Sequence, residues 1–162
     1  MTPRKLLALL VGAFALFLLW SWCWVPFECN EASKVLESAV EAARRGDPSA
    51  RAFLSDNIDR FVEVEKHLPQ DQALNISIGT TYSMMGLNED ALAMYEKSLI
   101  YDQRPEIYFN MAAIYDRMGQ VEKAREYYLT AALFNPDLAG RIADESLRLK
   151  VGAEVRKRLK LK

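Results

Sequence analysis

Apolar residues follow two different patterns along this chain, one unbroken and one periodic. Residues 6–25 form a run of 20 positions without a charged side chain. As a helix this run would span about 30 Å, the thickness of the hydrocarbon core of a bilayer. From about residue 30 onward, apolar residues recur every three or four positions, as they do in amphipathic helices. The pattern predicts an all-α chain, with one transmembrane helix followed by helical hairpins.

We interpret residues 1–27 as an uncleaved membrane anchor that contacts lipid, with Pro26 ending its helix. A cleaved signal peptide is the alternative, but its only small–x–small site is Ser21-Trp22-Cys23, with a bulky residue in the middle. A lipoprotein site needs a small residue before its cysteine, where this chain has Trp22 or Glu28. Tryptophans at the far end of the run are expected at the lipid–water boundary. The residues that mark the anchor are Leu6, Phe14, Leu18, Trp20, Trp22 and Trp24.

Charges on the two sides of the apolar run predict its orientation. Arg4 and Lys5 precede it, whereas Glu28 and Glu31 follow it. Because basic flanks stay in the cytoplasm, the N-terminus is expected there and the rest of the chain on the outer side. In a bacterium this side is the periplasm.

Residues 72–136 contain one pattern written twice, at an offset of 33 residues. A fixed period of this size is typical of stacked helical hairpins. Gly86 and Gly119 are expected to end the first helix of each copy, and Asn88 to cap the helix that follows. Pro105 and Pro136 fall at the junctions between units, where a helix can begin but not continue. The matching pairs are Ile78/Met111, Gly79/Ala112, Tyr82/Tyr115, Gly86/Gly119, Glu89/Glu122, Ala91/Ala124, Tyr95/Tyr128, Ser98/Ala131 and Tyr101/Phe134.

Small residues and tyrosines at matching positions are interpreted as framework. Gly79 and Ala91 in the first copy, like Ala112 and Ala124 in the second, would let the two helices of a hairpin approach closely. The tyrosines would fill the space between the helices. Each hairpin has too little apolar surface to stand alone, so the copies are expected to stack on neighbouring elements.

The segments on either side are also expected to be helical. Residues 28–69 form a predicted hairpin in which Gly46 ends the first helix and Asp47-Pro48 starts the second. Residues 137–162 predict a basic amphipathic capping helix, interrupted near Gly152, with a buried side spaced every four residues. That buried side consists of Ala143, Leu147, Val151, Val155 and Leu159. The alternative for this basic end is contact with anionic lipid or an acidic partner.

The duplicated stretch resembles the tetratricopeptide repeat family. The second copy matches its pattern at Tyr108, Met111, Ala112, Tyr115, Gly119, Ala124, Tyr128, Ala131 and Pro136. The first copy matches at Ile78, Gly79, Tyr82, Gly86, Ala91, Tyr95 and Ser98, and departs from it at Asn75 and Gln103. The resemblance implies a short α-solenoid, with repeats at 70–104 and 105–136 and a degenerate repeat-like hairpin at 28–69.

In this family the first helices of the repeats line a groove for a partner peptide. Transfer by motif position gives the predicted groove face: Ile76, Ser77, Thr80, Met84, Phe109, Asn110, Asp116 and Arg117. Asn110 stands where some relatives hold a terminal carboxylate, but Ile76 and Thr80 replace the lysine and asparagine expected of such a clamp. The resemblance therefore implies an extended peptide or a partner helix of mixed apolar and polar character.

Charge and reactive residues argue against several other functions. Residues 28–140 hold 11 Lys and Arg against 19 Asp and Glu, an acidic body that does not suit nucleic acid. Two cysteines and one histidine are too few for a metal site of recognisable spacing. Cys23 and Cys29 could pair in an oxidising compartment. Alternatively, Cys23 packs in the anchor and Cys29 is a free thiol just outside it. No catalytic constellation is present, so neither enzymatic activity nor a cofactor is expected.

Two hypotheses follow for function. The first is a membrane-anchored adaptor whose repeats hold a protein partner beside a membrane complex. The second is a small accessory or assembly subunit of a larger membrane enzyme complex, docked through its transmembrane helix. In both, the partners are proteins, including subunits of a membrane complex.

Overall fold

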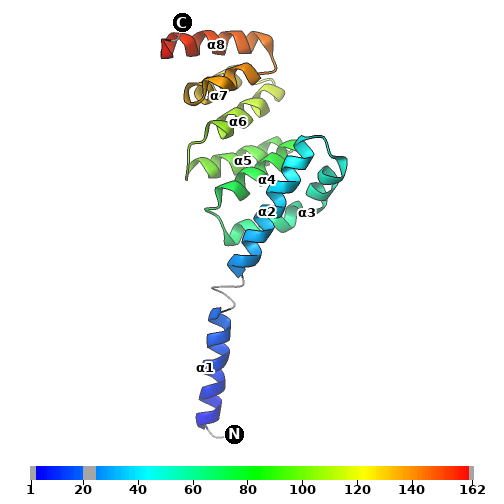
Figure 1. Ribbon diagram of the computed structural model, residues 1–162, viewed down its shortest axis with the longest axis vertical. Coiled ribbons are helices and arrows are strands. Elements are labelled where there is room, and N and C mark those ends of the chain that lie inside the picture. Colours follow the sequence, from blue (N-terminus) through cyan, green and yellow to red (C-terminus); the bar gives the residue numbers. More distant parts are fainter. Residues whose placement is uncertain (1–2, 20–24, 161–162) are drawn as a thin grey trace. The chain divides into compact units, whose positions relative to one another are not determined.

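The computed structural model describes the backbone of residues 3–19 and 25–160, and every regular element in these ranges is a helix (Figure 1). The chain divides into two compact units, residues 1–69 and residues 70–162. The all-α prediction is therefore confirmed for the described ranges.

Helix α1 (Pro3–Leu19) covers most of the predicted anchor. Phe14 and Leu18 are exposed on it, and Leu6 lies within its bounds. Trp20, Trp22 and Trp24 lie outside the described residues. Across the ranges that the structure describes, no helix combines the length and apolarity needed to cross a membrane.

The proline after the apolar run does not end a helix as expected. The described part of α1 reaches Leu19, and Pro26 is the second described residue of α2 (Val25–Arg44), which continues past it. A proline fits there because the first turn of a helix needs no N–H donor from it. Helix α2 thus begins earlier than residue 30.

The first unit contains a hairpin of α2 and α3 (Pro48–His67). Gly46 has a φ of 95°, and the Asp47 N–H donates to Ala42 O at 3.1 Å, which closes the turn as predicted. The Asp47 carboxylate caps α3 by accepting from the N–H groups of Ser49 and Ala50, at 2.9 and 3.4 Å. The hairpin core is mainly apolar, although it also buries Ser33 and Glu65, and includes Leu36, Val40, Ala43, Leu54, Ile58 and Phe61.

Cys29 is also buried, with 6% of its surface exposed. It lies within α2 and packs in the first hairpin, so protein covers its side chain. Cys23 lies outside the described residues, so the pairing of the two cysteines stays a prediction.

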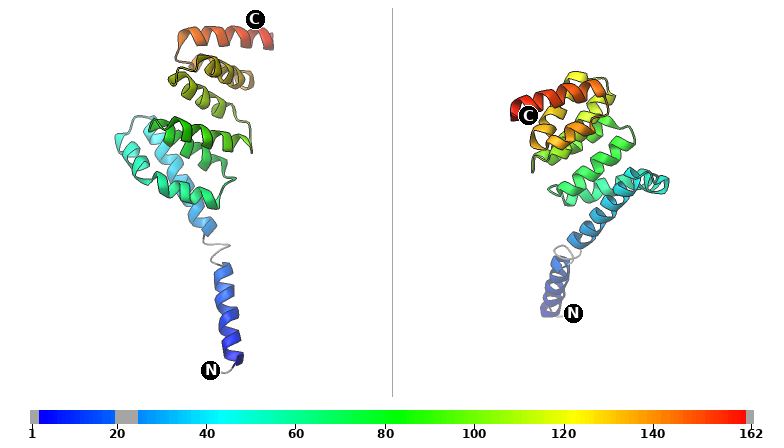
Figure 2. Two further views of the ribbon diagram at one scale, coloured as in Figure 1. Left: turned by 180° about the vertical axis from the view of Figure 1, so that it is seen from behind. Right: turned by 45° about the horizontal axis from the view of Figure 1, so that its top comes forward.

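The second unit is a stack of helices in chain order, as the views in Figures 1 and 2 agree. Its first hairpin is α4 (Gln72–Met84) with α5 (Asn88–Leu99), and its second is α6 (Pro105–Arg117) with α7 (Val121–Phe134). The 3₁₀ helix η2 (Pro136–Arg141) and α8 (Glu145–Leu159) follow and pack against α7.

Both hairpins of this unit turn in the same way. Gly86 and Gly119 have φ values of 79° and 71°, a left-handed conformation that glycine adopts without strain. In each turn the next N–H reaches back five residues, from Leu87 to Tyr82 O and from Gln120 to Tyr115 O, both at 2.9 Å. The predicted glycine caps are confirmed. The predicted cap at Asn88 is wrong, because Asn88 is the first residue of α5 and its side chain does not cap the helix.

The core of the second unit depends on the small residues that the two copies share. Ala91, Ala112 and Ala124 are fully buried. A Cβ at Gly79 would lie 3.0 Å from Cε1 of Tyr95 and 3.3 Å from the Ala91 carbonyl oxygen. A methyl group at Gly79 would therefore require Tyr95 or the α5 backbone to shift by a few tenths of an ångström, in agreement with the close approach that the framework interpretation predicts.

The C-terminal segment differs from the predicted helix at its start, at Gly152 and at Leu159, which is exposed and not buried. A 3₁₀ turn precedes α8, whose first turn is capped by Asp144 accepting from the Leu147 N–H at 2.7 Å. Ala143 is exposed and Ile142 takes its place in the core, because the chain is not yet helical there. The helix continues through Gly152 without interruption.

Candidate protein-interaction face

The eight residues of the predicted groove face come from α4 and α6, which are in contact. Their side chains do not form one exposed surface. Some are buried in the helix pair, some support neighbouring helices, and a smaller set remains accessible. Each group owes its position to contacts with residues distant in the sequence.

Ser77 and Thr80 are buried, each with 6% of its surface exposed, so their assignment to the groove face is wrong. The Thr80 hydroxyl lies 2.8 Å from Ile76 O and 3.0 Å from the Tyr95 hydroxyl on α5. A threonine in the helix interior satisfies its hydroxyl through the carbonyl four residues earlier. The bond between Thr80 and Tyr95 fastens α4 to α5, and makes Thr80 part of the framework.

Phe109 is half-buried and packs against the core of the second unit, as Ile76 does. The Tyr128 ring meets the Phe109 ring edge-on, with centroids 5.1 Å apart. On the other side, the Arg141 guanidinium lies 5.3 Å from the Phe109 ring centroid, a cation–π contact. Phe109 thus joins α6, α7 and η2, and its replacement would disturb all three.

Arg117 at the end of α6 binds the preceding hairpin. Its Nη2 donates to the Ser83 Oγ at 2.8 Å and to the Asn88 Oδ1 at 3.2 Å. These contacts connect α6 to the end of α4 and the start of α5. Because two of its donor contacts are used inside the unit, Arg117 chiefly sets the spacing between the two hairpins.

Besides Arg117, which is exposed although it contacts Ser83 and Asn88, three residues of the predicted groove face remain available to a partner. Met84 has 39% of its surface exposed, while Asn110 and Asp116 are half-buried. Met85 and Leu87 are exposed beside Met84, at 39% and 42%. The accessible set therefore combines a flexible apolar side chain with an amide and a carboxylate, groups that can contact both side chains and backbone of a peptide.

Two tyrosines of α7, Tyr127 and Tyr128, have raised pKa values. Burial, the Asp116 carboxylate and the more weakly acting Asp144 raise the pKa of Tyr128 to about 12, although Arg117 acts in the opposite direction. Burial, together with Tyr115, also raises the pKa of Tyr127. Both phenols stay protonated at neutral pH, so neither supplies an anion for chemistry.

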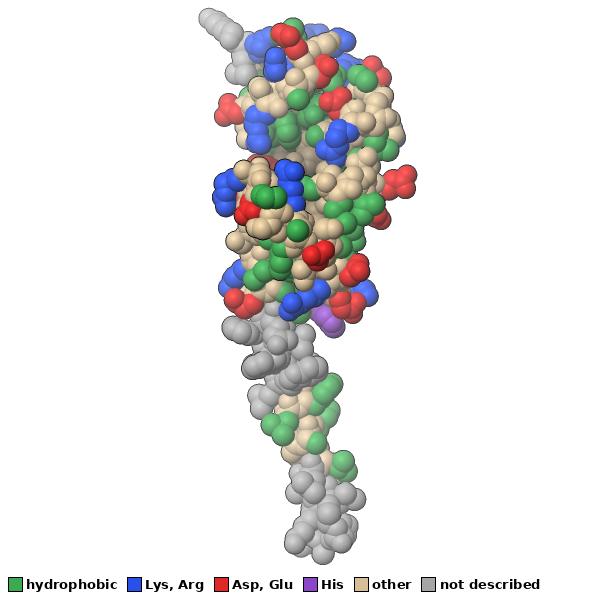
Figure 3. All heavy atoms as spheres, turned by 90° about the vertical axis from the view of Figure 1, so that its right-hand side faces the viewer, with side chains coloured by type: hydrophobic (Ala, Val, Ile, Leu, Met, Phe, Trp, Pro, Cys, Tyr) green, Lys and Arg blue, Asp and Glu red, His purple; other side chains and the backbone are tan. Residues whose placement is uncertain are grey.

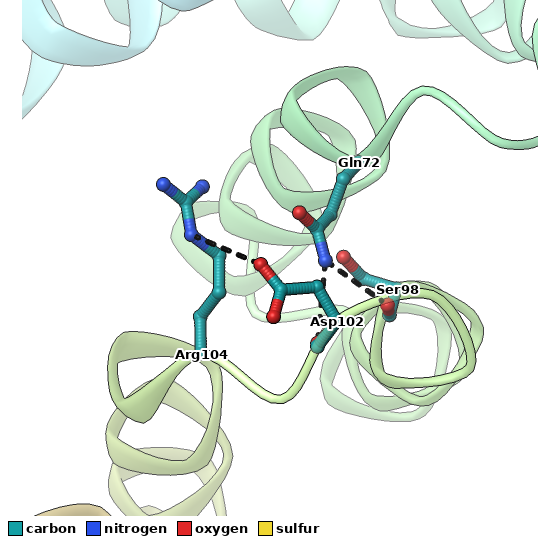
Figure 4. A network of polar contacts seen from close by, with 4 residues as sticks. All are labelled: Gln72, Ser98, Asp102 and Arg104. Atoms are coloured by element: carbon teal, nitrogen blue, oxygen red, sulfur yellow. Dashed lines mark hydrogen bonds and ion pairs between the residues drawn. The ribbon is translucent and has the colours of Figure 1, made fainter. Parts of the chain in front are cut away.

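The junction between the two hairpins is held by polar contacts from the first turn of α4 (Figure 4). The Gln72 Nε2 donates to Asp102 O at 3.2 Å and to Ser98 O at 3.4 Å. Arg104 Nε lies 3.9 Å from the Asp102 carboxylate. This network fixes the short loop from α5 to α6, where the chain has Gln103 in place of a proline.

Sequence reasoning missed Arg141 and the Ser83–Arg117–Asn88 contact. Arg141 was assigned to a basic capping segment, and its place over Phe109 follows from the 3₁₀ turn that precedes α8. The only available signal was Pro136 after Asn135, which favours a turn but does not predict its target. Ser83 and Arg117 are 34 residues apart, close to one repeat period, and such spacing was the signal that could have paired them.

Comparison with known proteins agrees with this geometry. A sequence profile describing the tetratricopeptide repeat matches residues 105–138, which cover α6, α7 and the start of η2. A comparison with curated proteins gave no match.

Residues 105–138 thus match a tetratricopeptide repeat, and the stacked helical hairpins of the second unit agree with this similarity. Repeats of this family generally bind other proteins and do not catalyse reactions. Protein–protein interaction is accordingly the role that the second unit supports.

Proposed function

We propose that this protein is a membrane-anchored adaptor whose repeat unit holds a segment of a protein partner beside a membrane complex. The observation that carries the interaction is the tetratricopeptide repeat of α6 and α7 and the accessible polar face of α6. The anchor rests on the uncharged run at residues 6–25.

The contact surface that we propose is smaller than the predicted groove face. It centres on Met84, Asn110 and Asp116, which keep accessible surface. Phe109 and Arg117 support this surface from behind through their contacts with Arg141 and Ser83. A bound chain would be an extended peptide or a helix with an apolar residue for Met84 and polar groups for Asn110 and Asp116.

The orientation that we propose places the N-terminus in the cytoplasm and the repeat unit on the outer side of the membrane. Its support is the placement of Arg4 and Lys5 before the apolar run and of Glu28 and Glu31 after it. An enzyme-like role has no support from any group of residues described above.

Site-specific photocrosslinking of the full chain in its native cells tests the proposal. A photoreactive amino acid replaces Asn110, and the control carries it at Glu126, which is exposed on α7. We expect a discrete crosslinked protein from position 110 and none from position 126, identified by mass spectrometry. Equal crosslinking at both positions, or none at either, would contradict the proposed surface.

A pair of point variants measures the contribution of this surface. Asn110→Ala removes an amide and Asp116→Asn removes a negative charge, without enlarging either side chain, and Glu126→Ala is the matched control. We expect each of the first two to weaken partner recovery about 5-fold to 20-fold, the usual effect of losing one polar contact at an interface. Circular dichroism must show unchanged helicity in all three.

Docking through the membrane segment is the alternative, and an exchange of that segment separates the two. Residues 6–24 are replaced by an unrelated apolar segment of equal length, which leaves α2 intact from Val25. An adaptor keeps its crosslink from position 110 after this exchange. Loss of the crosslink with the substitute segment in the membrane would favour the docked accessory subunit.

A further inference from the structure

Helix α8 has two sides of different character. Leu147, Val151 and Val155 are buried against the rest of the second unit. The opposite side carries residues whose spacing of one, four, seven and eight positions places them on one face of a helix. We call this side the outer face of α8. It consists of Leu149, Lys150, Ala153, Arg156 and Lys157, all exposed, and the exposed Lys160 follows as the C-terminal cap.

The outer face holds three cations, and Lys160 adds a fourth just beyond the end of the helix; the exposed Glu145 lies at the edge of the face, four residues before Leu149. Of the two acidic residues within α8, Glu145 lies in the first turn, and Glu154 lies on the flank, where its Oε1 accepts from the Arg158 Nε at 2.7 Å. Figure 3 shows Lys and Arg side chains gathered at the C-terminal end of the chain. Residues 141–162 hold 8 Lys and Arg against 3 Asp and Glu, in contrast to the acidic body before them.

Stabilisation of the helix accounts for only part of this charge. Cations in the last turn interact favourably with the negative end of the helix dipole, which explains Arg156 and Lys157. Lys150 lies in the first half of α8, where the dipole gives a cation no benefit. Leu149, with 62% of its surface exposed, gains nothing from solvent. Together these two residues indicate a contact beyond the helix itself.

We propose that the outer face of α8 binds the surface of an anionic lipid membrane. Its lysines are separate point charges on flexible stems, which suits a field of headgroups more than one fixed carboxylate. Leu149 stands among these cations, at the place from which an apolar side chain can enter the lipid interface. The contact is independent of the N-terminal run and would hold the repeat unit against the membrane at a second point.

The experiment uses the full chain with an environment-sensitive dye at a single cysteine. The dye is placed by Leu149→Cys, with Ala93→Cys on the exposed side of α5 as the control position, in a Cys23→Ser, Cys29→Ala background. Each protein is mixed with vesicles of phosphatidylcholine alone, or of phosphatidylcholine and phosphatidylglycerol in equal parts. Circular dichroism verifies that every variant is folded.

We expect the dye at position 149 to shift its emission only with the anionic vesicles, and added salt to reverse the shift. Replacing the four cations by Lys150→Gln, Arg156→Gln, Lys157→Gln and Lys160→Gln should reduce the response at least about tenfold. The matched control removes four exposed cations of the first unit and should leave the response unchanged: Lys34→Gln, Arg45→Gln, Arg51→Gln and Arg60→Gln.

Three results would overturn the lipid contact. The first is an identical dye response at positions 149 and 93, and the second is a response that does not depend on phosphatidylglycerol. The third is an emission shift produced by soluble polyglutamate but not by the anionic vesicles, which would assign the face to an acidic protein. Failure of the membrane anchor gives a different result, because the chain would then stay unbound to phosphatidylcholine vesicles while the dye at position 149 still responds to anionic ones.

Discussion

The two hairpins of the second unit share their turns and small residues but are fastened by different interactions. In the first hairpin the Tyr95 hydroxyl lies 3.0 Å from the Thr80 hydroxyl. In the second, Tyr128 occupies the place of Tyr95, and Ala113 occupies the place of Thr80. Tyr128 instead packs its ring against Phe109, at 5.1 Å between centroids.

The difference extends along the first helix of each hairpin. Helix α4 buries Asn75, Thr80 and Thr81, whereas α6 buries Ile114 at the position that matches Thr81. Thr81 satisfies its hydroxyl by donating to Ser77 O at 2.9 Å. The two helices of a repeat can thus be joined by a polar or an aromatic contact, provided that the small residues keep the helices close.

The largest expected effect comes from removing the ring contact between Tyr128 and Phe109. Tyr128→Ala removes a ring that is 97% buried and leaves Phe109 without its edge-on partner. We expect the free energy of unfolding to fall by about 3–5 kcal/mol, measured by chemical denaturation. A loss below about 1 kcal/mol would show that the second hairpin does not depend on this pair.

Alkaline pH should weaken the same hairpin. The pKa of Tyr128 is raised to about 12 in the folded protein, from 10.0. Between these values the folded state keeps a proton that the unfolded state has lost, so stability is full below pH 10 and falls as pH rises towards 12. Tyr128→Phe should make this fall shallower, and Tyr127, whose pKa is also raised, should account for part of what remains. Denaturation midpoints over this pH range provide the measurement.

Overpacking should affect both copies to a similar extent. Ala91 and Ala124 are fully buried at matching positions of α5 and α7. Ala124→Leu and Ala91→Leu should each cost about 1–3 kcal/mol, because neither hairpin has room for three more carbons. An unchanged thermal midpoint for either variant would contradict the close approach of its helices.

Removal of the hydroxyl of Tyr95 or of Tyr128 should change the free energy of unfolding by different amounts in the two hairpins. Tyr95→Phe deletes the partner of Thr80 and should cost about 1 kcal/mol. Tyr128→Phe should cost less than about 0.5 kcal/mol at neutral pH, because the ring contact with Phe109 survives. Equal losses in thermal denaturation would mean that the hydrogen bond does not distinguish the two hairpins.

The smallest expected effect is stabilising. Ser98 is fully buried, and within the described part of the chain its Oγ has no hydrogen-bond partner. The matching residue of the second copy is Ala131. Ser98→Ala should therefore stabilise the protein by up to about 1 kcal/mol, and the reverse change Ala131→Ser should destabilise it by about 1–3 kcal/mol. Thermal midpoints that move in the same direction would contradict this reasoning.

Several helix ends were predictable because they depend on a few neighbouring residues. Gly86 and Gly119 adopt the left-handed conformation that closes a helix, and Asp47 caps α3 with its own carboxylate. Other ends were not predictable. Asn88 has the right chemistry for a cap, but its amide oxygen accepts from Arg117 of the next hairpin. The proline after the apolar run fits the first turn of a helix as well as the end of one.

The candidate interaction face was only partly predictable. Motif position correctly placed its residues on α4 and α6, yet it carried no information on accessibility. Thr80 faces Tyr95, and Phe109 lies beneath Arg141, because chain segments 15 and 32 residues away fold back over them. Asn110 and Asp116, by contrast, stay accessible enough to serve a partner.

The sequence by itself determined the all-α class, the repeat and its framework, since a helical period, glycine caps and small residues act through local geometry. It also contained the uncharged run at residues 6–25 and the separation of acidic body from basic end. Only the tertiary structure decided which of the residues that differ between the two copies are buried, contact a neighbouring helix or remain exposed. That outcome depends on neighbours supplied by other helices, and no local pattern in the chain encodes those neighbours.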